Sequence, residues 1–273
     1  MDNQTFFQDK VIIVTGASSG IGLASARLFG RCGARVVMAA RSYDKLLALA
    51  PSVGDGDHVL CVRTDVSVEE DCRRLVEQTV SRFGRIDILV NNAGISMRAM
   101  FKDLDLKVLH SLMDVNYWGT VYCTKHALPY LLASKGSVVG VISIAGYSAL
   151  PARTGYSSSK YAIRGFLDTV RIEHLKDGLH VLVFAPGYTA SNVRKAALVA
   201  DGSAQGETPL DENGLMSAED CALYLAQALR KRKSHMTLTP LGKATVLAHN
   251  LFPNLTDRLT YWYISREKDS PFQ

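Results

Sequence analysis

The amino-acid sequence predicts an α/β protein with a doubly wound parallel sheet between two layers of helices. Short β-branched or apolar runs alternate with helical patterns along most of the 273 residues. A fully apolar run at residues 86–90 is typical of a strand buried on both faces of a parallel sheet. The chain also opens on a strand, a glycine-rich turn and a helix. Such sheets hold their ligands at the carboxyl ends of the strands.

The predicted strands are short, apolar and rich in β-branched residues. They cover residues 11–15, 34–40, 58–63, 86–90, 137–144, 179–184 and 236–239. The predicted helices lie between them: one from the glycine-rich turn to Arg31, one around Tyr156 to about residue 176, and others at residues 43–50, 68–83, 104–115, 117–134 and 218–230. This alternation of strand and helix predicts a parallel, doubly wound sheet.

Local signals define several helix ends. Pro51 ends the helix at residues 43–50, since proline cannot continue a helix. Ser67 and Ser217 are predicted N-caps, because a hydroxyl oxygen can accept a hydrogen bond from the first turn. Residues 69–71 are acidic and fall in a first turn, where the helix dipole favours negative charge.

Composition and charge exclude several classes of protein. With 47% apolar residues the chain can bury a large core. The net charge of +5 is small and spread out, so we expect no nucleic-acid partner. Five cysteines without a CxxC pair fit a reduced, cytoplasmic protein, and seven histidines without ligand spacing predict no metal. Residues 1–10 are polar and no apolar run reaches transmembrane length, so neither a signal sequence nor a membrane span is expected.

Tyr156 and Lys160 are the first candidates for chemistry. They are four residues apart, so on a helix both side chains would project from the same face. An ammonium beside a phenol favours the phenolate and would lower the tyrosine pKa from about 10. Such a phenol can pass a proton to or from a carbonyl oxygen, which Ser143 could hold in place. The same spacing is also common on exposed helices without any function.

The glycine-rich turn at residues 16–22 is a candidate anion site. Glycine lets the backbone approach a ligand closely, and the N-terminus of the following helix favours an anion. The spacing is GxxxGxG, whereas the commonest dinucleotide fingerprint is GxGxxG. The position of the turn after the first strand therefore carries more weight than the glycines alone.

Together these motifs resemble the short-chain dehydrogenase/reductase family, in its main single-domain, NADP-preferring subgroup. The resemblance covers residues 10–240 and keeps the family order of motifs. The matching motifs are Thr15 to Gly22, Asp65-Val66, Asn91-Asn92-Ala93-Gly94, Asn116, Ser143, Tyr156-x-x-x-Lys160 and Pro186-Gly187. The resemblance implies a Rossmann-like three-layer sandwich with a central, parallel, seven-stranded sheet.

The resemblance also implies a role for each matched residue. Tyr156 would be the general acid/base, Lys160 would lower its pKa and bind the nicotinamide ribose, and Ser143 would hold the substrate oxygen. Asn116 would hold a water that links Lys160 to solvent. The other implied cofactor contacts are Gly16, Ser18, Ser19, Gly20, Ile21 and Gly22 at the pyrophosphate, Asp65 and Val66 at the adenine, Asn92, Ala93 and Gly94 at the adenosine ribose, and Pro186, Gly187 and Thr189 at the nicotinamide. Residues 186–190 depart slightly from the family pattern, so Thr189 matches less closely.

The end of the second predicted strand favours NADP(H) over NAD(H). It reads Ala39-Ala40-Arg41-Ser42, with no acid before Asp44. NAD-binding proteins place an acid there for the ribose 2′-hydroxyl, whereas an arginine suits the 2′-phosphate. Ser19 argues the other way, because many NADP-using relatives have a basic residue at that position.

The predicted reaction is hydride transfer between NADP(H) and a carbonyl or secondary alcohol, as in a carbonyl reductase. The substrate pocket is predicted at residues 95–101, 145–153 and 188–214, with Tyr147 and Tyr188 as substrate contacts beside Ser143 and Tyr156. A lipophilic small molecule is expected from the apolar side chains there, namely Met97, Met100, Tyr147, Leu150, Tyr188 and Leu198. The alternatives are a non-catalytic dinucleotide sensor or scaffold, and an epimerase or dehydratase. The complete set of acid/base residues argues against the first, and the Asn-Asn-Ala-Gly stretch against the second.

Residues 241–273 are predicted to be a helical extension of the single domain at residues 1–240. Many large apolar residues recur within 243–264, and Pro253 divides that segment into two helices too short to span a bilayer. We expect protein to cover this surface, either the same domain or a sister subunit of a homodimer or homotetramer, beside the substrate entrance. Peripheral contact with a membrane is the alternative.

Overall fold

The computed structural model describes residues 2–189, 193–206, 215–266 and 270–272. Within these residues seven parallel strands form one sheet in the order β3-β2-β1-β4-β5-β6-β7. The strands are β1 (Val11–Thr15), β2 (Arg35–Ala40), β3 (Val59–Arg63), β4 (Ile88–Asn91), β5 (Ser137–Val141), β6 (His180–Ala185) and β7 (His235–Thr237). The chain reverses its direction of travel across the sheet between β1 and β4, and the predicted doubly wound fold is confirmed. Ligands bind at this switch point in open α/β sheets.

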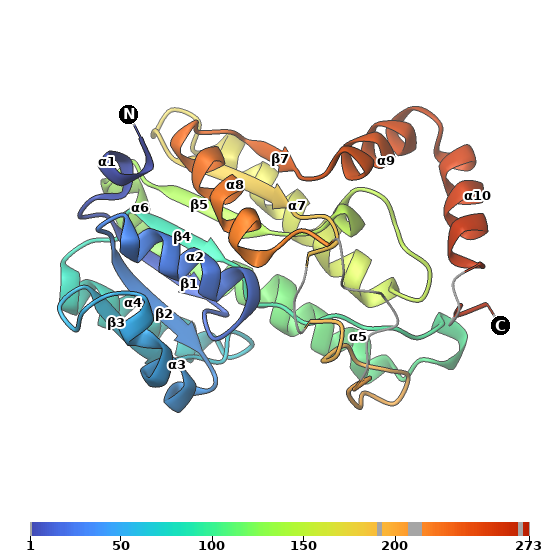
Figure 1. Cartoon of the computed structure of the whole chain (residues 1–273), viewed down its shortest axis with the longest axis horizontal. Coiled ribbons are helices and arrows are strands. Elements are labelled where there is room, and N and C mark those ends of the chain that lie inside the picture. The colour runs from blue at the N-terminus through green and yellow to red at the C-terminus, as the bar shows by residue number, and fades with distance from the viewer. Residues whose placement is uncertain (1, 190–192, 207–214, 267–269, 273) are drawn as a thin grey trace.

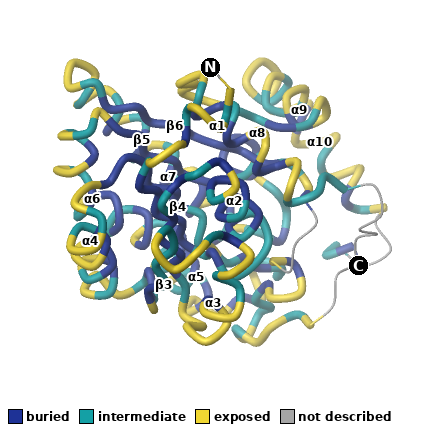
Figure 2. Tube along the Cα trace, turned by 60° about the vertical axis from the view of Figure 1, so that its left-hand side comes forward, coloured by how far each residue is buried: buried dark blue, intermediate teal, exposed yellow. Residues whose placement is uncertain are grey.

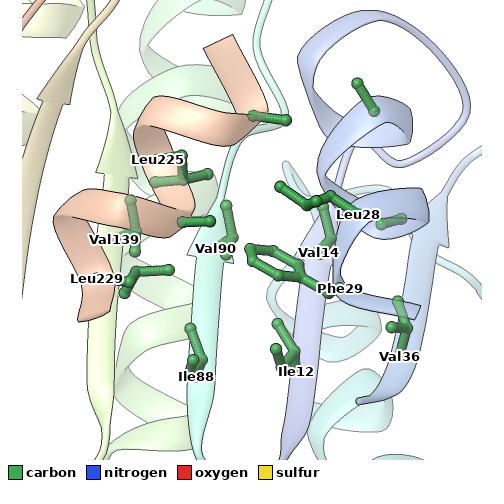
Figure 3. Packing of buried hydrophobic residues seen from close by; sticks show 14 of the residues in the cluster. Ile12, Val14, Leu28, Phe29, Val36, Ile88, Val90, Val139, Leu225 and Leu229 are labelled. Carbon is green, nitrogen blue, oxygen red and sulfur yellow. The ribbon is translucent and has the colours of Figure 1, made fainter. Parts of the chain in front are cut away.

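Helices cover both faces of the sheet (Figure 1). Helices α2 (Gly20–Arg31) and α8 (Ala218–Arg230) lie on one face, and α4 (Glu69–Phe83), α6 (Gly119–Ala133) and α7 (Thr154–Glu173) lie on the other. Figure 3 shows Phe29 of α2 and Leu225 of α8 packed against Ile12 and Val90 of the strands. Each such side chain contributes about 1.5–3 kcal/mol through burial, so the two faces hold the strand ends in fixed positions.

The shorter helices connect these layers. They are α1 (Asn3–Phe7), α3 (Tyr43–Leu49) and α5 (Leu106–Leu112), with 3₁₀ turns at Ala50–Ser52, Phe101–Asp103 and Ile144–Gly146. The helices predicted at residues 104–115 and 117–134 are joined, because a π-helical segment, Met113–Trp118, continues α5 directly into α6. Such π segments are rare and often occur at functional sites.

One of the two predicted serine caps is confirmed. The Ser217 hydroxyl accepts a hydrogen bond from the Asp220 N–H at the start of α8. Ser67 is not the cap of α4, which begins after Val68. The Ser67 N–H and hydroxyl instead donate to Asp65 Oδ1, at 3.0 and 2.7 Å, so its side chain closes the loop before the helix.

The C-terminal segment forms two short helices, as predicted. They are α9 (Pro240–Leu251) and α10 (Pro253–Ile264), and Pro253 opens the second, where it needs no partner for a missing N–H. Several of their large apolar side chains are exposed, as the yellow stretches of Figure 2 show, including Phe252 at 61% and Trp262 at 52%. The described residues of the domain therefore do not cover these side chains, and cover by a sister subunit, or by a membrane surface as the alternative, stays a prediction. No helix in the described ranges has the length and apolarity needed to cross a bilayer.

Candidate active site

A cleft of about 410 Å³ opens at the carboxyl ends of β1 to β6. It lies at the switch point between β1 and β4 and continues toward the start of α7. Most of the predicted site residues line it: Gly16, Ser18, Ser19, Gly20, Ile21, Arg41, Asp65, Val66, Asn92, Ala93, Gly94, Ser143, Tyr156, Lys160, Pro186, Gly187, Tyr188 and Thr189. One connected cleft thus brings together segments that are far apart in the sequence.

The glycine-rich turn forms the wall of the cleft next to β1. Gly16 has φ +68°, and a Cβ on it would lie 2.9 Å from the Ala93 Cα and 2.9 Å from the side-chain nitrogen of Asn92, Nδ2. A Cβ on Gly22 would lie 2.4 Å from the Gly16 carbonyl oxygen, so this glycine allows close packing within the turn. Ser19 precedes α2 and its side chain caps no N–H group of the described residues. The first N–H groups of α2 therefore face the cleft, where they can bind an anion such as a pyrophosphate.

Asn92 ties the ends of β1 and β4 together. Its side-chain nitrogen donates to the Thr15 carbonyl oxygen at 2.9 Å, and its backbone N–H donates to the Thr15 hydroxyl at 3.0 Å. The Ala93 N–H also donates to that hydroxyl at 3.0 Å. These bonds hold the floor of the cleft rigid, while Asn92 still contributes to the cleft surface.

Ser143, Tyr156 and Lys160 converge where β5 meets α7. Ser143 follows β5 and is the N-cap of the Ile144–Gly146 turn, where its oxygen accepts from the Ala145 N–H at 3.2 Å. Tyr156 and Lys160 lie on the first turns of α7, as their spacing predicts. The Lys160 Nζ lies 5.7 Å from the centre of the Tyr156 ring and donates to the Val141 carbonyl oxygen at 2.9 Å. A carbonyl oxygen placed between Ser143 and Tyr156 would meet two hydroxyl donors.

Burial sets the acid/base properties of this group. It raises the pKa of Tyr156 above its ordinary value of 10.0, against the smaller lowering effects of the hydrogen bond with Ser143 and the charge of Arg153. Burial also lowers the pKa of Lys160 from 10.5 to about 8. The prediction of a lowered tyrosine pKa is therefore wrong for the chain alone, because loss of hydration outweighs these lowering effects. Tyr156 is thus protonated at neutral pH and can donate a proton.

Asn116 is completely buried in the π-helical segment. Its Oδ1 accepts from the Ile95 N–H at 2.8 Å, and its Nδ2 donates to the Ile95 carbonyl oxygen and the Ser159 hydroxyl at 3.0 and 2.9 Å. A Cβ on Gly94 would lie 3.0 Å from Asn116 Oδ1 and 3.4 Å from Lys160 Nζ. Asn116 does not line the cleft directly, but it joins the loop that follows β4 to α7, the helix that carries Lys160.

Comparison with known proteins decides the family. The family model described as "short chain dehydrogenase" matches residues 10–200. The chain belongs to the short-chain dehydrogenase family. It is 34% identical over 267 residues to 11-beta-hydroxysteroid dehydrogenase 1A of Arabidopsis thaliana, covering 92% of this chain and 75% of that protein.

Solved structures show the same fold. An alcohol dehydrogenase from the archaeon Thermococcus sibiricus, complexed with 5-hydroxy-NADP, is 26% identical with a TM-score of 0.74, covering 85% of this chain and 96% of that one. A short chain dehydrogenase/reductase from Burkholderia phymatum in complex with NAD has a TM-score of 0.80 over 91% and 95% of the two chains, at 21% identity. The second likeness concerns the fold alone.

Four predicted pocket residues of this short-chain dehydrogenase, Met97, Met100, Tyr147 and Leu198, do not line the cleft. Tyr147 points away from the cleft, because its hydroxyl lies 3.0 Å from the His235 Nδ1 and its ring packs under the guanidinium of Arg164. Met97 and Leu198 lie outside the cleft surface, packed together in a small core cluster beside α5. Tyr147, Met97 and Leu198 pack in core clusters. The sequence pattern alone does not distinguish an apolar core residue from an apolar residue that lines a pocket. Part of the predicted 188–214 stretch, residues 190–192 and 207–214, lies outside the described residues.

Polar side chains also lie at the predicted nicotinamide and substrate end of the short-chain dehydrogenase site. The Thr189 hydroxyl donates to the Gly187 carbonyl oxygen at 3.3 Å and lies beside the buried Cys221, so it is engaged within the protein. Arg153 and Arg194 line the cleft. Both arginines fall in the stretches predicted to line the pocket, residues 145–153 and 188–214, although the prediction named neither side chain.

Proposed function

We propose that this member of the short-chain dehydrogenase family is an NADP(H)-dependent oxidoreductase that reduces the carbonyl group of a lipophilic small molecule. The observation that carries the proposal is the convergence of Ser143, Tyr156 and Lys160 in the cleft that also contains the glycine-rich turn. Three polar side chains around one position, next to a dinucleotide-sized surface, suit hydride transfer better than simple binding.

The residues of the cleft fit a bound nicotinamide dinucleotide. Gly16 lets the turn pack tightly against Asn92 and Ala93 at the edge of the cleft, and the N-terminus of α2 suits the pyrophosphate. When bound, the reduced nicotinamide supplies the hydride to the carbonyl carbon. Tyr156 then gives its phenolic proton to the carbonyl oxygen, while Ser143 donates a hydrogen bond to the same oxygen. Lys160, with a pKa of about 8, can exchange protons near neutral pH and so help to restore the proton of Tyr156.

The protonation state of Tyr156 favours reduction over oxidation. Reduction needs the neutral phenol as a proton donor, whereas oxidation of an alcohol needs the phenolate as a base. Because burial raises the pKa of Tyr156, the neutral phenol predominates at neutral pH. At neutral pH Tyr156 is therefore in the form that the proposed reduction requires.

The proposed preference for NADP(H) rests on cations at the ends of β2 and β3. Arg41 follows β2 and lines the cleft, and Arg63 ends β3 beside Ala40 of β2. Together they can bind a ribose 2′-phosphate, although Asp44 also lies nearby. The two solved structures hold 5-hydroxy-NADP and NAD respectively, so they leave the choice to the residues of this chain.

A lipophilic substrate and a homo-oligomer complete the proposal. Leu150 and Tyr188 give the substrate side of the cleft an apolar surface, and the Arabidopsis relative is named for a hydroxysteroid. The exposed apolar side chains of α9 and α10 suit contact with a sister subunit in a homodimer or homotetramer. The five cysteines are free thiols, which fits a cytoplasmic protein.

One panel of ketones and alcohols tests the proposal. Purified protein is incubated with each compound and NADPH, NADH or the oxidised forms, and turnover is followed at the nicotinamide absorbance. We expect reduction of lipophilic ketones with NADPH at rates well above those with NADH. Tight NADPH binding without turnover of any compound would favour the alternative of a dinucleotide sensor.

A further inference from the structure

The side chain of Arg153 lines the same cleft, next to the position of the substrate. Arg153 lies immediately before α7, three residues ahead of Tyr156. Its Nη1 donates to the Ser96 hydroxyl at 2.7 Å and to the Met97 carbonyl oxygen at 3.2 Å. Both acceptors are neutral and both residues are buried, so the contacts fix the guanidinium without neutralising its charge.

No carboxylate within residues 2–189, 193–206, 215–266 and 270–272 forms an ion pair with Arg153. Burial lowers the pKa of Arg153; the charges of Tyr156 and Tyr188 act against this effect, and those of Arg98 and Arg194 add to it. Arg194 is itself only 6% exposed and lines the cleft. A partly buried cation without an ionic partner is unfavourable unless an anion joins it.

Arg153 also lines the cleft together with Tyr156 and Ser143. It precedes the first turn of α7, which carries Tyr156 three residues later. A substrate whose carbonyl oxygen meets Tyr156 and Ser143 would therefore place atoms a few bonds away beside the guanidinium. In the described residues the Arg153 Nε and Nη2 donate to no protein acceptor, so they can form a two-bond contact with a carboxylate or phosphate.

We propose that Arg153 is a specificity-determining residue that selects carbonyl substrates carrying an anionic group, a carboxylate or a phosphate, a few bonds from the reacting carbon. The inference rests on the proposed carbonyl reduction and deepens it, since it defines a lipophilic substrate with a charged end. A role confined to holding residues 96–97 against α7 is the competing explanation.

Matched substrate pairs test the proposal. One pair is 5-oxodecanoate and its methyl ester, and the other is 1-hydroxy-2-decanone and its phosphate monoester. In the wild type we expect kcat/KM to be about 10- to 100-fold higher for the anionic member of at least one pair, as a charged hydrogen-bonded contact would give. The pair with the larger ratio tells whether the natural group is a carboxylate or a phosphate.

Three variants assign the effect to Arg153. In Arg153→Met the ratio between the members of a pair should fall to about one, and in Arg153→Lys it should be only partly retained. Any change in the pKa of Tyr156 acts on both members of a pair and cancels in the ratio. The matched control, Arg82→Met, removes an exposed arginine on α4 and should leave the ratio unchanged. An Arg153→Met ratio equal to that of the wild type would overturn the proposal, as would a wild-type ratio near one for both pairs.

A binding measurement separates this proposal from the proposed reaction. Calorimetry with decanoate and with decyl phosphate on NADPH-loaded protein needs no turnover. We expect the wild type to bind at least one of these anions about tenfold more tightly than Arg153→Met does. Equal binding by the two proteins would refute the role of Arg153, whether or not any ketone is reduced. Tighter binding by the wild type without turnover would leave the anion site standing and refute carbonyl reduction.

Discussion

Replacing Asn116 with alanine should destabilise the fold and the active site together. The change removes three hydrogen bonds, two to the backbone of Ile95 and one to the Ser159 hydroxyl. At about 1 kcal/mol for each bond, the free energy of unfolding should fall by about 3 kcal/mol. At roughly 2 °C per kcal/mol for a domain of this size, Tm should fall by about 6 °C. Because Gly94 and Ile95 line the cleft, turnover should also decrease.

Urea unfolding followed by circular dichroism measures this loss. The control is Asn250→Ala, because Asn250 is exposed on α9 and its removal should change the free energy of unfolding by less than about 0.5 kcal/mol. If Asn116→Ala unfolds at the same urea concentration and with the same slope as the wild type, the hydrogen-bond network that we describe does not hold the site together.

Three further predictions concern the cofactor, the acid response and the tail. Arg41→Asp should shift the ratio of kcat/KM values from NADPH toward NADH, because a carboxylate repels the 2′-phosphate; a wild type that already prefers NADH would show that Arg41 has been misinterpreted. Burial holds the pKa of His180 below its ordinary value of 6.5, so the unfolded state binds more protons as the pH falls through that value; the free energy of unfolding should therefore decrease below about pH 6.5, and less steeply in His180→Gln. Phe252→Glu should reduce the mass measured by light scattering if a sister subunit covers α9 and α10, whereas an unchanged mass with weaker binding to liposomes would support membrane contact instead.

The sequence predicted the layered fold and most of the cleft because both depend on local patterns. Apolar runs and helical periodicity give the strands and helices directly, and the switch point then brings the strand ends, with Gly16, Asn92 and Ser143, to one edge. The boundaries were accurate where a proline or a capping serine acts locally, as at Pro253 and Ser217.

What the sequence could not provide depends on tertiary packing. The π-helical segment holds Asn116, whose side-chain amide bonds to Ile95, 21 residues away in the sequence. Tyr147 looks like a pocket residue until the position of His235 on β7 is known. The pKa of Tyr156 likewise depends on how much water the folded cleft excludes, so the effect of a neighbouring lysine could not be judged from spacing alone.

The most direct test of the central claim is the turnover of Tyr156→Phe, which keeps the ring and removes only the hydroxyl. With NADPH and the best ketone of the panel, kcat should fall by at least ~10²-fold, the usual scale for the loss of a general acid, while the Kd for NADPH stays within about twofold. Tyr130→Phe, on the exposed surface of α6, serves as the matched control and should keep wild-type turnover. Near-normal turnover in Tyr156→Phe would contradict the assignment of Tyr156 as the proton donor.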